Sequence, residues 1–367
     1  MAKIIHTADL HLKTGDEKAY CFSVLDEIIA LAITEKAEFL IISGDIFDSF
    51  PDFVALRAEF AKKVTSPGSF RTICIPGNHE ALRSGGKDLG LYDLPGVEFK
   101  TAKPFSVADG GDVEFICVPH AEDYDNYRDW PIPAKQPGKA RILMIHGLNS
   151  TIYTGPEEEG EARAGVIDDG LFTGFAPDYA ALGHIHRPNQ NMVGGVTAAY
   201  PGSPRVWRAS DKESGRRFVK VIETHGDKAP AIMIREIKAA GQYREYSLPL
   251  ALDGSADAAA IEAIKKSAGL RDRLKIKLSG IVEDEKRLAE TEVALKTELS
   301  GSVRILEIER GDITPCAEIS SNPLAQNFLE LLDRRKPPEG DQRQEQVWLL
   351  ARQAGLKAIA DKIGAGL

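Results

Sequence analysis

The sequence contains few cysteines, no long hydrophobic run and no excess of positive charge. Four cysteines are spread over 367 residues without a Cys-x-x-Cys pair, which predicts buried, reduced thiols rather than a disulfide framework. No run approaches the roughly 18 apolar residues needed to span a bilayer, and the first residues lack the apolar stretch of an export signal. We therefore expect a cytoplasmic protein without a membrane anchor.

The charge balance limits the binding partners. Lys and Arg together number 46 and Asp and Glu 55, so the formal net charge is −9. Such a chain is not expected to hold nucleic acid through bulk electrostatics alone, although a local basic groove remains compatible with it. The 43% hydrophobic and 28% charged content is that of an ordinary globular protein, and the length suffices for two or three domains.

Polar residues follow each predicted strand in the first third of the chain. Apolar runs predict strands at residues 3–7, 39–42 and 71–75, with amphipathic helices at 17–36 and 52–64 between them. Asp9 and His11 follow the first strand, Asp45 follows the second, and Asn78 and His79 follow the third. Because active sites of open α/β sheets lie at the carboxyl ends of the strands, we expect these side chains to meet.

Two later strands end in the same way. A predicted strand at 141–145 leads to His146, and another at 179–182 leads to His184 and His186. Alternation along an extended segment would place His184 and His186 on one side. We also expect short strands between residues 97 and 118 and an exposed loop at 149–165.

Five strand ends with metal-binding residue types are difficult to explain by packing. They carry five of the eight histidines, and burying such groups without partners would cost several kcal/mol each. Metal ions would resolve this cost. Asp45 is the central residue of this hypothesis, since the two oxygens of one carboxylate can bridge two cations.

These motifs resemble those of the calcineurin-like metallophosphoesterases. The family motifs Asp-x-His, Gly-Asp-x-x-Asp/His, Gly-Asn-His-Asp/Glu, a lone His and Gly-His-x-His match, in order, residues 9–11, 44–48, 77–80, 146 and 183–186. The resemblance implies a four-layer αββα sandwich and two divalent cations, most simply Mn²⁺, with iron or zinc as rivals. It assigns one cation to Asp9, His11, Asp45 and His186, and the other to Asp45, Asn78, His146 and His184.

A narrower resemblance covers roughly the first 240 residues. The segments at 5–12, 181–186 and 200–204 are similar to those of SbcD and the wider meiotic-recombination-eleven nuclease family, with departures at Leu10, Lys13, Asp48 and Glu80. The resemblance implies a DNA exonuclease and single-strand endonuclease that processes ends in double-strand break repair. It also implies a homodimer formed through residues 52–64 and 86–94, and a complex with an SbcC-type coiled-coil ATPase.

The implied chemistry is hydrolysis by two cations, which about 3.5–4 Å apart can deprotonate a water for attack on phosphorus. His79 binds neither cation in this scheme. We therefore predict that it protonates the leaving oxygen or stabilises the charge on the phosphoryl group. The alternative is that it makes only a structural hydrogen bond. We expect structural roles for His6, His120 and His225, with support of a metal ligand as the alternative for His120. Candidate DNA contacts, each equally compatible with a solvated charge, are Arg83, Arg187, Arg205 and Arg208.

The rest of the chain predicts two further domains. Strands at 217–223 and 231–237 are expected to complete the second layer of the sandwich in a nuclease domain of residues 1–240. A βαβαβ pattern then predicts a small α/β capping domain at 241–315, in which Lys275 and Lys277 either contact phosphate or form a solvated strand face. Residues 316–367 predict two helices that either bind the ATPase or fold back on their own chain.

Two other functions remain open from the sequence. The same ligand set could serve a stand-alone phosphoesterase acting on a small nucleotide or a phosphoprotein. The chain could also mainly organise DNA ends or the ATPase, with structural metals. The capping domain and the helical tail favour a nuclease component of an ATPase complex over the stand-alone enzyme.

Overall fold

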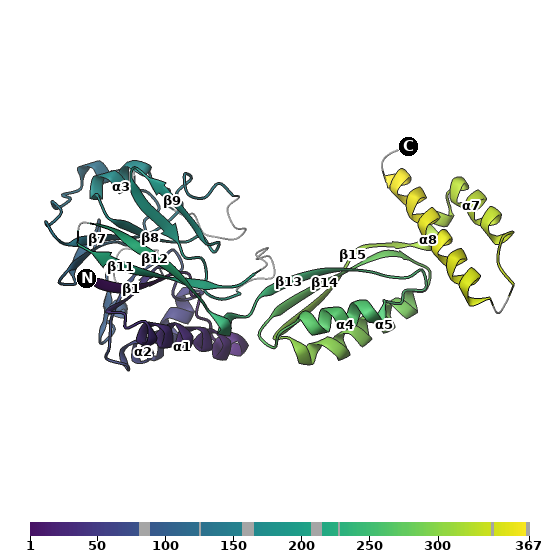
Figure 1. Cartoon of the computed structure of the whole chain (residues 1–367), viewed down its shortest axis with the longest axis horizontal. Coiled ribbons are helices and arrows are strands. Elements are labelled where there is room, and N and C mark those ends of the chain that lie inside the picture. The colour runs from purple at the N-terminus through teal and green to yellow at the C-terminus, as the bar shows by residue number, and fades with distance from the viewer. Residues whose placement is uncertain are drawn as a thin grey trace. The chain divides into compact units, whose positions relative to one another are not determined.

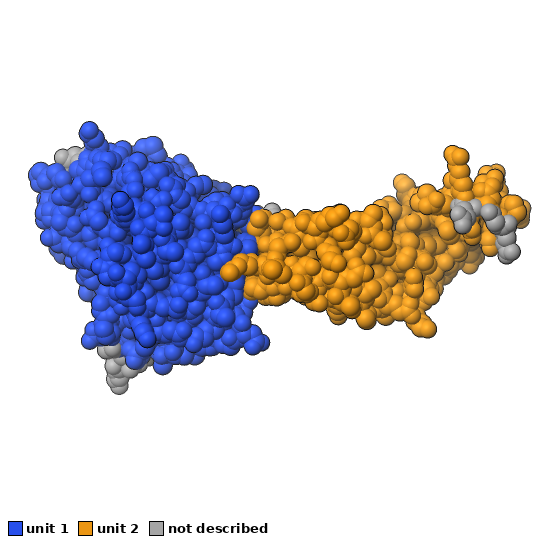
Figure 2. All heavy atoms as spheres, turned by 60° about the horizontal axis from the view of Figure 1, so that its bottom comes forward, with its two compact units in different colours: residues 1–241 blue, residues 242–367 orange. Residues whose placement is uncertain are grey.

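The computed structural model describes residues 1–80, 89–124, 126–155, 165–206, 215–226, 228–338 and 341–364. The chain divides into two compact units, residues 1–241 and 242–367, which Figure 2 shows in different colours. The three-part division into nuclease, capping and partner-binding domains stays a prediction, since the second unit contains both of the last two parts. No helix in the described part of the chain is long and apolar enough to cross a membrane.

Within its described residues, the first unit forms a four-layer α/β sandwich, as predicted. One sheet has the order β12 (Lys228–Glu236), β11 (Phe218–His225), β1 (Ala2–Thr7), β2 (Phe39–Ser43), β3 (Arg71–Ile75) and β4 (Val97–Phe99). The other has the order β5 (Ser106–Asp109), β6 (Val113–Val118), β7 (Ala140–His146), β8 (Tyr179–Gly183), β10 (Val196–Tyr200) and β9 (Asn189–Val193). Helices α1 (Lys18–Thr34) and α2 (Phe50–Thr65) cover the first sheet, and α3 (Asp169–Phe175) lies on the opposite side of the sandwich (Figure 1).

The layers are held by apolar cores on both faces of the sheets. Strands β2 and β7 are buried along their whole length, as expected for strands covered on both sides. Between the sheets, Ile41 of β2 and Met144 of β7 belong to one buried cluster, together with Phe115 of β6. Leu25 of α1 and Phe60 of α2 belong to a second cluster on the outer face of the first sheet. This packing fixes the strand ends that carry the candidate site.

One prediction about the strands is wrong, and two strands were not predicted. Strands β11 and β12 join the first sheet rather than the second, since β11 pairs antiparallel with β1, with Ile222 opposite Ile4. The hydrophobic pattern of a strand cannot show which of two buried sheets the strand joins. Strands β9 and β10 were missed because β9 is short, polar and largely exposed; the available signal was Gly194–Gly195, whose positive φ values suit a tight hairpin.

The cysteines are buried and free, as their spacing predicted. This holds for all four, Cys21, Cys74, Cys117 and Cys316. Of the exposed loop predicted at 149–165, residues 156–164 lie outside the described residues. In the described part the prediction is wrong for Asn149, Ile152 and Tyr153, which are buried.

The second unit has the predicted βαβαβ order. Its parallel sheet has the order β13 (Tyr243–Pro249), β14 (Arg273–Val282) and β15 (Ile305–Pro315), with α4 (Ala258–Ser267) and α5 (Glu285–Leu299) packed against it (Figure 1). Alternation buries Leu274, Ile276 and Leu278 on the helix side. On the other side, Lys275 pairs with Glu309 and Lys277 with Glu245, both at 2.8 Å. These cross-strand pairs favour a solvated strand face over phosphate contacts.

The C-terminal helices fold back on their own unit. They are α6 (Cys316–Ser320), α7 (Pro323–Asp333) and α8 (Gln342–Gly364). Asn322 caps α7, because its side chain accepts a hydrogen bond from the backbone N–H of Leu324. Leu356 and Ile359 of α8 pack with Ile281 of β14. Part of the apolar surface of these helices is thereby covered within the chain.

Candidate metal centre

The carboxyl ends of five parallel strands carry the candidate ligands. Strands β1, β2 and β3 are neighbours in one sheet, and β7 and β8 are neighbours in the other. The amide nitrogens of Asp9 and His11 donate to the carbonyls of Gly44 and Asp45, each at 3.0 Å, so the tips of β1 and β2 are joined directly. The residues predicted from separate motifs therefore converge on one site.

Among the described residues, ligand atoms form three groups, and within each group all of these atoms lie within 4.8 Å of one another. The groups are Asp9, His11 and His186; Asp45, His146 and His184; and His11, Asp45 and His79, which shares a residue with each of the other two. Nε2 of His11 lies 3.0 Å from Nε2 of His186. The side-chain oxygen of Asn78 lies 2.9 Å from His146 Nε2 and 3.3 Å from His184 Nδ1. The first two groups are subsets of the two ligand sets that the family resemblance implied, and the division between two cations stays a prediction.

Backbone conformation at the site is unusual. Among the described residues, six non-glycine residues have a positive φ, and four of them are candidate ligands: Asp9 (55°), His11 (44°), Asp45 (50°) and His184 (105°). Such conformations cost on the order of 1–3 kcal/mol each and persist only where surrounding contacts fix them. The extended segment predicted for His184 and His186 is therefore wrong; a left-handed turn directs the two rings to different groups.

The glycines of the motifs allow the tips to approach closely. A Cβ at Gly44 would lie 2.3 Å from His146 Nδ1, one at Gly183 1.9 Å from the Ser43 carbonyl oxygen, and one at Gly77 2.1 Å from Asp45 Oδ1. No side chain fits at such distances, so these positions require glycine.

Replacing Gly77 with alanine is expected to displace the Asp45 carboxylate. Overpacking of this kind costs about 1–3 kcal/mol, and we expect Mn²⁺ affinity to fall by at least about tenfold because a ligand is moved. Thermal unfolding and calorimetric titration with Mn²⁺ measure the two effects. Gly301→Ala is the control, since a Cβ there meets nothing within 4 Å; equal Mn²⁺ affinity in the two variants would contradict the packing argument.

The donor set fits a cation. Oδ2 of Asp9 is buried and accepts no hydrogen bond from the described residues, and Oδ2 of Asp45 is also buried, 3.3 Å from His146 Nε2 without hydrogen-bond geometry. His146 Nδ1 donates to the carbonyl of Ser43 at 2.8 Å, which presents Nε2 as a ligand atom. Buried carboxylate oxygens without hydrogen bonds are costly, and a cation satisfies them.

Burial and charge shift the pKa values at this site in opposite directions. Burial raises the pKa of Asp9 to about 8. Burial also acts to raise the pKa of Asp45, but the imidazoles of His146, His79 and His11 hold it well below its usual range. For His146, burial acts to lower the pKa, and the Asp45 and Asp9 carboxylates raise it to about 9. A cation would favour the deprotonated form of each group.

His79 lies at the more open side of the site. Its side chain is 13% exposed, whereas those of Asp45 and His146 are completely buried. His79 Nδ1 donates to the carbonyl of Asp48 at 2.5 Å, and its backbone N–H donates to Asp45 Oδ1 at 3.0 Å. Nε2 of His79 lies 4.0 Å from Asp45 Oδ2. The hydrogen bond from Nδ1 to the Asp48 carbonyl thus fixes the orientation of the ring, and Nε2 points toward Asp45.

Glu80 is a supporting residue that the motif match did not explain. Its buried carboxylate accepts hydrogen bonds from the backbone N–H groups of Asp45 (3.2 Å), Phe47 (2.6 Å) and Gly77 (2.9 Å). Burial, and then the charge of Asp45, raise its pKa to about 7. Glu80 therefore ties the tips of β2 and β3 together, and the signal for this role was an acidic residue directly after Asn78 and His79.

The remaining histidines lie in three different environments, and their structural roles stay predictions. His6 Nδ1 lies 2.9 Å from the hydroxyl of Tyr179, and burial lowers the pKa of His6 to about 3. His120 is buried beside His146, with ring centroids 5.9 Å apart, so it packs against a ligand. His225 is exposed at the end of β11.

The four candidate DNA contacts have different positions. Arg187 is exposed next to His186. Arg205 is completely buried, and its guanidinium donates to carbonyls inside the protein, so the structure argues against the DNA contact predicted for it. Arg83 and Arg208 lie outside the described residues.

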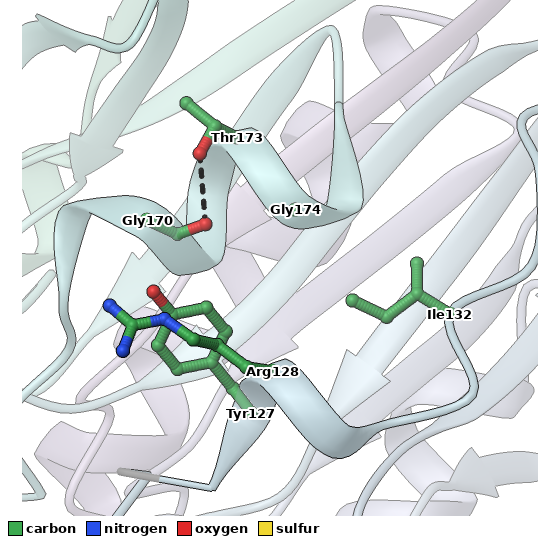
Figure 3. Close-up of a pocket in the computed structure, with 6 residues that line it drawn as sticks. All are labelled: Tyr127, Arg128, Ile132, Gly170, Thr173 and Gly174. Carbon is green, nitrogen blue, oxygen red and sulfur yellow. Dashed lines mark hydrogen bonds between the residues drawn. The ribbon is translucent and has the colours of Figure 1, made fainter.

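A surface pocket lies apart from these residues. It is lined by Tyr127, Arg128, Ile132, Gly170, Thr173 and Gly174 (Figure 3). The guanidinium of Arg128 lies over the ring of Tyr127, and the hydroxyl of Thr173 donates to the carbonyl of Gly170. None of the candidate ligands lines this pocket.

Comparison with known proteins shows the family. The calcineurin-like phosphoesterase family matches residues 2–188, about half of the chain and the part that holds every candidate ligand. The chain therefore belongs to the calcineurin-like phosphoesterases, as the motifs predicted.

Two curated relatives carry nuclease or repair names. The chain is 26% identical over 240 residues to the DNA double-strand break repair protein Mre11 of Saccharolobus solfataricus, covering 60% of this chain and 59% of that protein. It is 23% identical over 264 residues to the SbcD component of the nuclease SbcCD of Bacillus subtilis, covering 62% and 68%. The chain thus matches about three fifths of the length of the first relative.

Among solved structures, the chain is similar to a purple acid phosphatase from yellow lupin (Lupinus luteus). The sequences are 14% identical, the match covers 66% of this chain and 52% of the other, and the TM-score is 0.45.

Proposed function

We propose that this protein is a metal-dependent DNA nuclease that processes DNA ends in double-strand break repair. The observation that carries the proposal is the convergence of Asp9, His11, Asp45, Asn78, His146, His184 and His186 from five strand ends, with His79 beside them. The names of the relatives, Mre11 and the SbcD component of the nuclease SbcCD, support DNA as the substrate.

Seven residues would hold two divalent cations, most simply Mn²⁺, with iron or zinc as alternatives. Asp9, His11 and His186 would hold one, Asn78, His146 and His184 the other, and Asp45 would be shared. When bound, the cations supply Lewis-acid chemistry: they activate water and neutralise the charge of the scissile phosphate. Asp45 is buried, its Oδ1 accepts a hydrogen bond from the backbone N–H of His79, and its Oδ2, which accepts no hydrogen bond from the described residues, lies 3.3 Å from His146 Nε2.

His79 is assigned the proton transfer at the leaving oxygen. Its Nδ1–H is held by the Asp48 carbonyl, so Nε2 is the atom that would carry a proton to or from substrate. Its partial exposure beside buried ligands suits a group that must meet a substrate entering from solvent.

A substrate comparison tests the proposal. The purified chain is incubated with labelled single-stranded DNA, duplex DNA and a small phosphodiester, each with and without Mn²⁺. We expect Mn²⁺-dependent cleavage of DNA. Cleavage of the small ester alone would instead support a stand-alone phosphoesterase, and Mn²⁺ binding without any hydrolysis would support an organising role.

We also propose that α7 and α8 bind an SbcC-type coiled-coil ATPase. Apolar side chains remain exposed on these helices although others pack inward: Leu324 is 57% exposed, Leu331 61%, Val347 61% and Leu350 60%. Leu324 and Leu331 are seven residues apart and share one face of α7. Exposed apolar stripes on neighbouring helices are typical of helix-binding surfaces.

Negative charges placed on the exposed apolar surface of α7 and α8 are expected to weaken binding of the ATPase. The variant Leu331→Asp, Leu350→Asp should bind the coiled coil of the ATPase at least about 30-fold more weakly, since a central apolar contact contributes about 2 kcal/mol or more. Calorimetry with the coiled-coil segment measures the affinity. Val293→Asp is the control, because Val293 of α5 is also 64% exposed; equal loss of affinity in both variants would contradict a site on α7 and α8.

We also propose a homodimer formed through residues 52–64 and 86–94, of which residues 86–88 lie outside the described residues. Measuring the molecular mass of the purified chain in solution tests this proposal.

A further inference from the structure

The segment from Ser203 to Arg205 contacts the backbone of Asp9, His11 and His186. These are the unshared ligands of one proposed cation. The hydroxyl of Ser203 donates to the carbonyl of Asp9 at 2.8 Å, and the amide of Ser203 donates to the carbonyl of His186 at 3.0 Å. The guanidinium of Arg205 donates from Nη2 to the carbonyl of His11 at 2.6 Å and from Nε to the carbonyl of Leu10 at 2.9 Å.

These contacts meet the backbone where it is strained. Asp9 and His11 have φ values of 55° and 44°, in the left-handed region. Their amides are fixed by the carbonyls of Gly44 and Asp45, as described above, and the contacts from Ser203 and Arg205 fix their carbonyls. The backbone is thereby held on both sides of each residue, which orients the two side chains toward the site.

The buried guanidinium of Arg205 divides its contacts between these carbonyls and two acidic side chains. The residue is 0% exposed, and besides the two carbonyls its guanidinium lies 3.2 Å from Glu17 Oε2 and 3.9 Å from Asp48 Oδ1. Burying a guanidinium is costly unless its donors are satisfied. A planar fork can serve two carbonyls and a carboxylate in fixed directions, which a lysine ammonium cannot do.

We propose that Arg205 and Ser203 are positioning residues that hold the ligands of the cation bound by Asp9, His11 and His186. The proposal rests on the metal centre proposed above and not on the identity of the substrate. Among the described residues, no hydrogen bond from Ser203 or Arg205 reaches the unshared ligands of the other cation, Asn78, His146 and His184. Loss of the Arg205 contacts should therefore weaken one cation selectively.

Titration of the purified full chain with Mn²⁺ alone tests the proposal. In Arg205→Met, we expect one of two Mn²⁺ ions to bind about 10- to 100-fold more weakly, the usual effect of removing a residue that orients a metal ligand, while the other ion binds as in the wild type. Ser203→Ala should weaken the same ion, at the lower end of that range. Electron paramagnetic resonance of Mn²⁺ provides a second readout, because a spin-coupled pair and a lone ion give different spectra.

Arg141→Met is the matched control. Arg141 is also buried, at 1% exposed, and donates to Glu114 and to the carbonyl of Phe175, each at 2.8 Å, but it contacts no candidate ligand among its recorded partners. It should lose stability and keep both Mn²⁺ affinities, whereas a general effect of removing a buried arginine would appear in both variants.

Three results would overturn the proposal. Unchanged binding of both ions in Arg205→Met would do so, as would equal weakening of both ions, or the same loss in Arg141→Met. If Arg205→Met does not fold, the Mn²⁺ affinities of Ser203→Ala test the proposal by the same criteria. This variant is a smaller change, because it removes only the hydroxyl that donates to the Asp9 carbonyl. A wild-type chain that binds fewer than two Mn²⁺ ions would overturn the metal centre itself, whereas a chain that binds two ions but does not cleave DNA would leave this inference intact.

Discussion

Replacing Asp45 with asparagine is expected to remove both cations together and to lower phosphodiester hydrolysis by at least about 10³-fold. Cations contribute several kcal/mol to stabilising the charge of a phosphoryl transition state, and each 1.4 kcal/mol is a factor of ten in rate. Asp45 is completely buried among His11, His79, His146 and Glu80, so a neutral amide there, with a single ligand oxygen, removes the shared carboxylate without opening the site. Metal content by mass spectrometry and cleavage of DNA measure the two effects.

Single-ligand variants provide the comparison for Asp45→Asn. His11→Ala and His146→Ala should each weaken mainly one cation, because each residue belongs to only one of the two proposed sites. If Asp45→Asn keeps one cation at full affinity, Asp45 is not shared. If it keeps full DNA cleavage, the site is assigned to the wrong residues.

Replacing His79 with glutamine is expected to keep both cations and to lower turnover by about 10²- to 10⁴-fold, the usual contribution of a general acid. Glutamine retains a side-chain donor for the Asp48 carbonyl, and the backbone N–H of residue 79 still donates to Asp45 Oδ1. The loss should therefore appear in kcat rather than in metal binding. Measurement of kcat and KM on labelled DNA, together with Mn²⁺ titration, separates the two.

His225→Gln is the control for this variant, since His225 is exposed on β11. Wild-type turnover in His79→Gln would show that the histidine is structural. Loss of a cation in His79→Gln would instead place His79 among the ligands, which its position within 4.8 Å of ligand atoms of His11 and Asp45 makes a real alternative.

The candidate ligands were predictable because each follows a continuous apolar run. Such a run defines a buried strand, and the residue after it must lie at the sheet edge; β3 (Arg71–Ile75) has the predicted bounds, and β2 extends one residue beyond them. The motif spacing then identified the candidate ligands that the described part of the structure brings together. The proposed assignment of ligands to each cation rests on resemblance, because a sequence pattern does not show the positive φ values at Asp9, Asp45 and His184 that orient these side chains.

The supporting residues could not be predicted because their contacts are to distant backbone. Arg205 donates to carbonyls nearly 200 positions earlier in the chain, and Glu80 accepts amide hydrogens at Asp45 and Phe47. A sequence shows only that such residues are charged, and a charged residue near a motif is first interpreted as a surface group. The same limit applies to β11, whose pairing partner β1 lies more than 200 residues away.

The shared position of Asp45 is tested most directly by locating the metals. Crystals of the full chain grown with Mn²⁺ give an anomalous difference map at the manganese absorption edge. We predict two adjacent peaks, one beside Asp9, His11 and His186 and one beside Asn78, His146 and His184, with the Asp45 carboxylate in contact with both. A single peak, or two peaks of which only one contacts Asp45, would contradict the proposed metal centre.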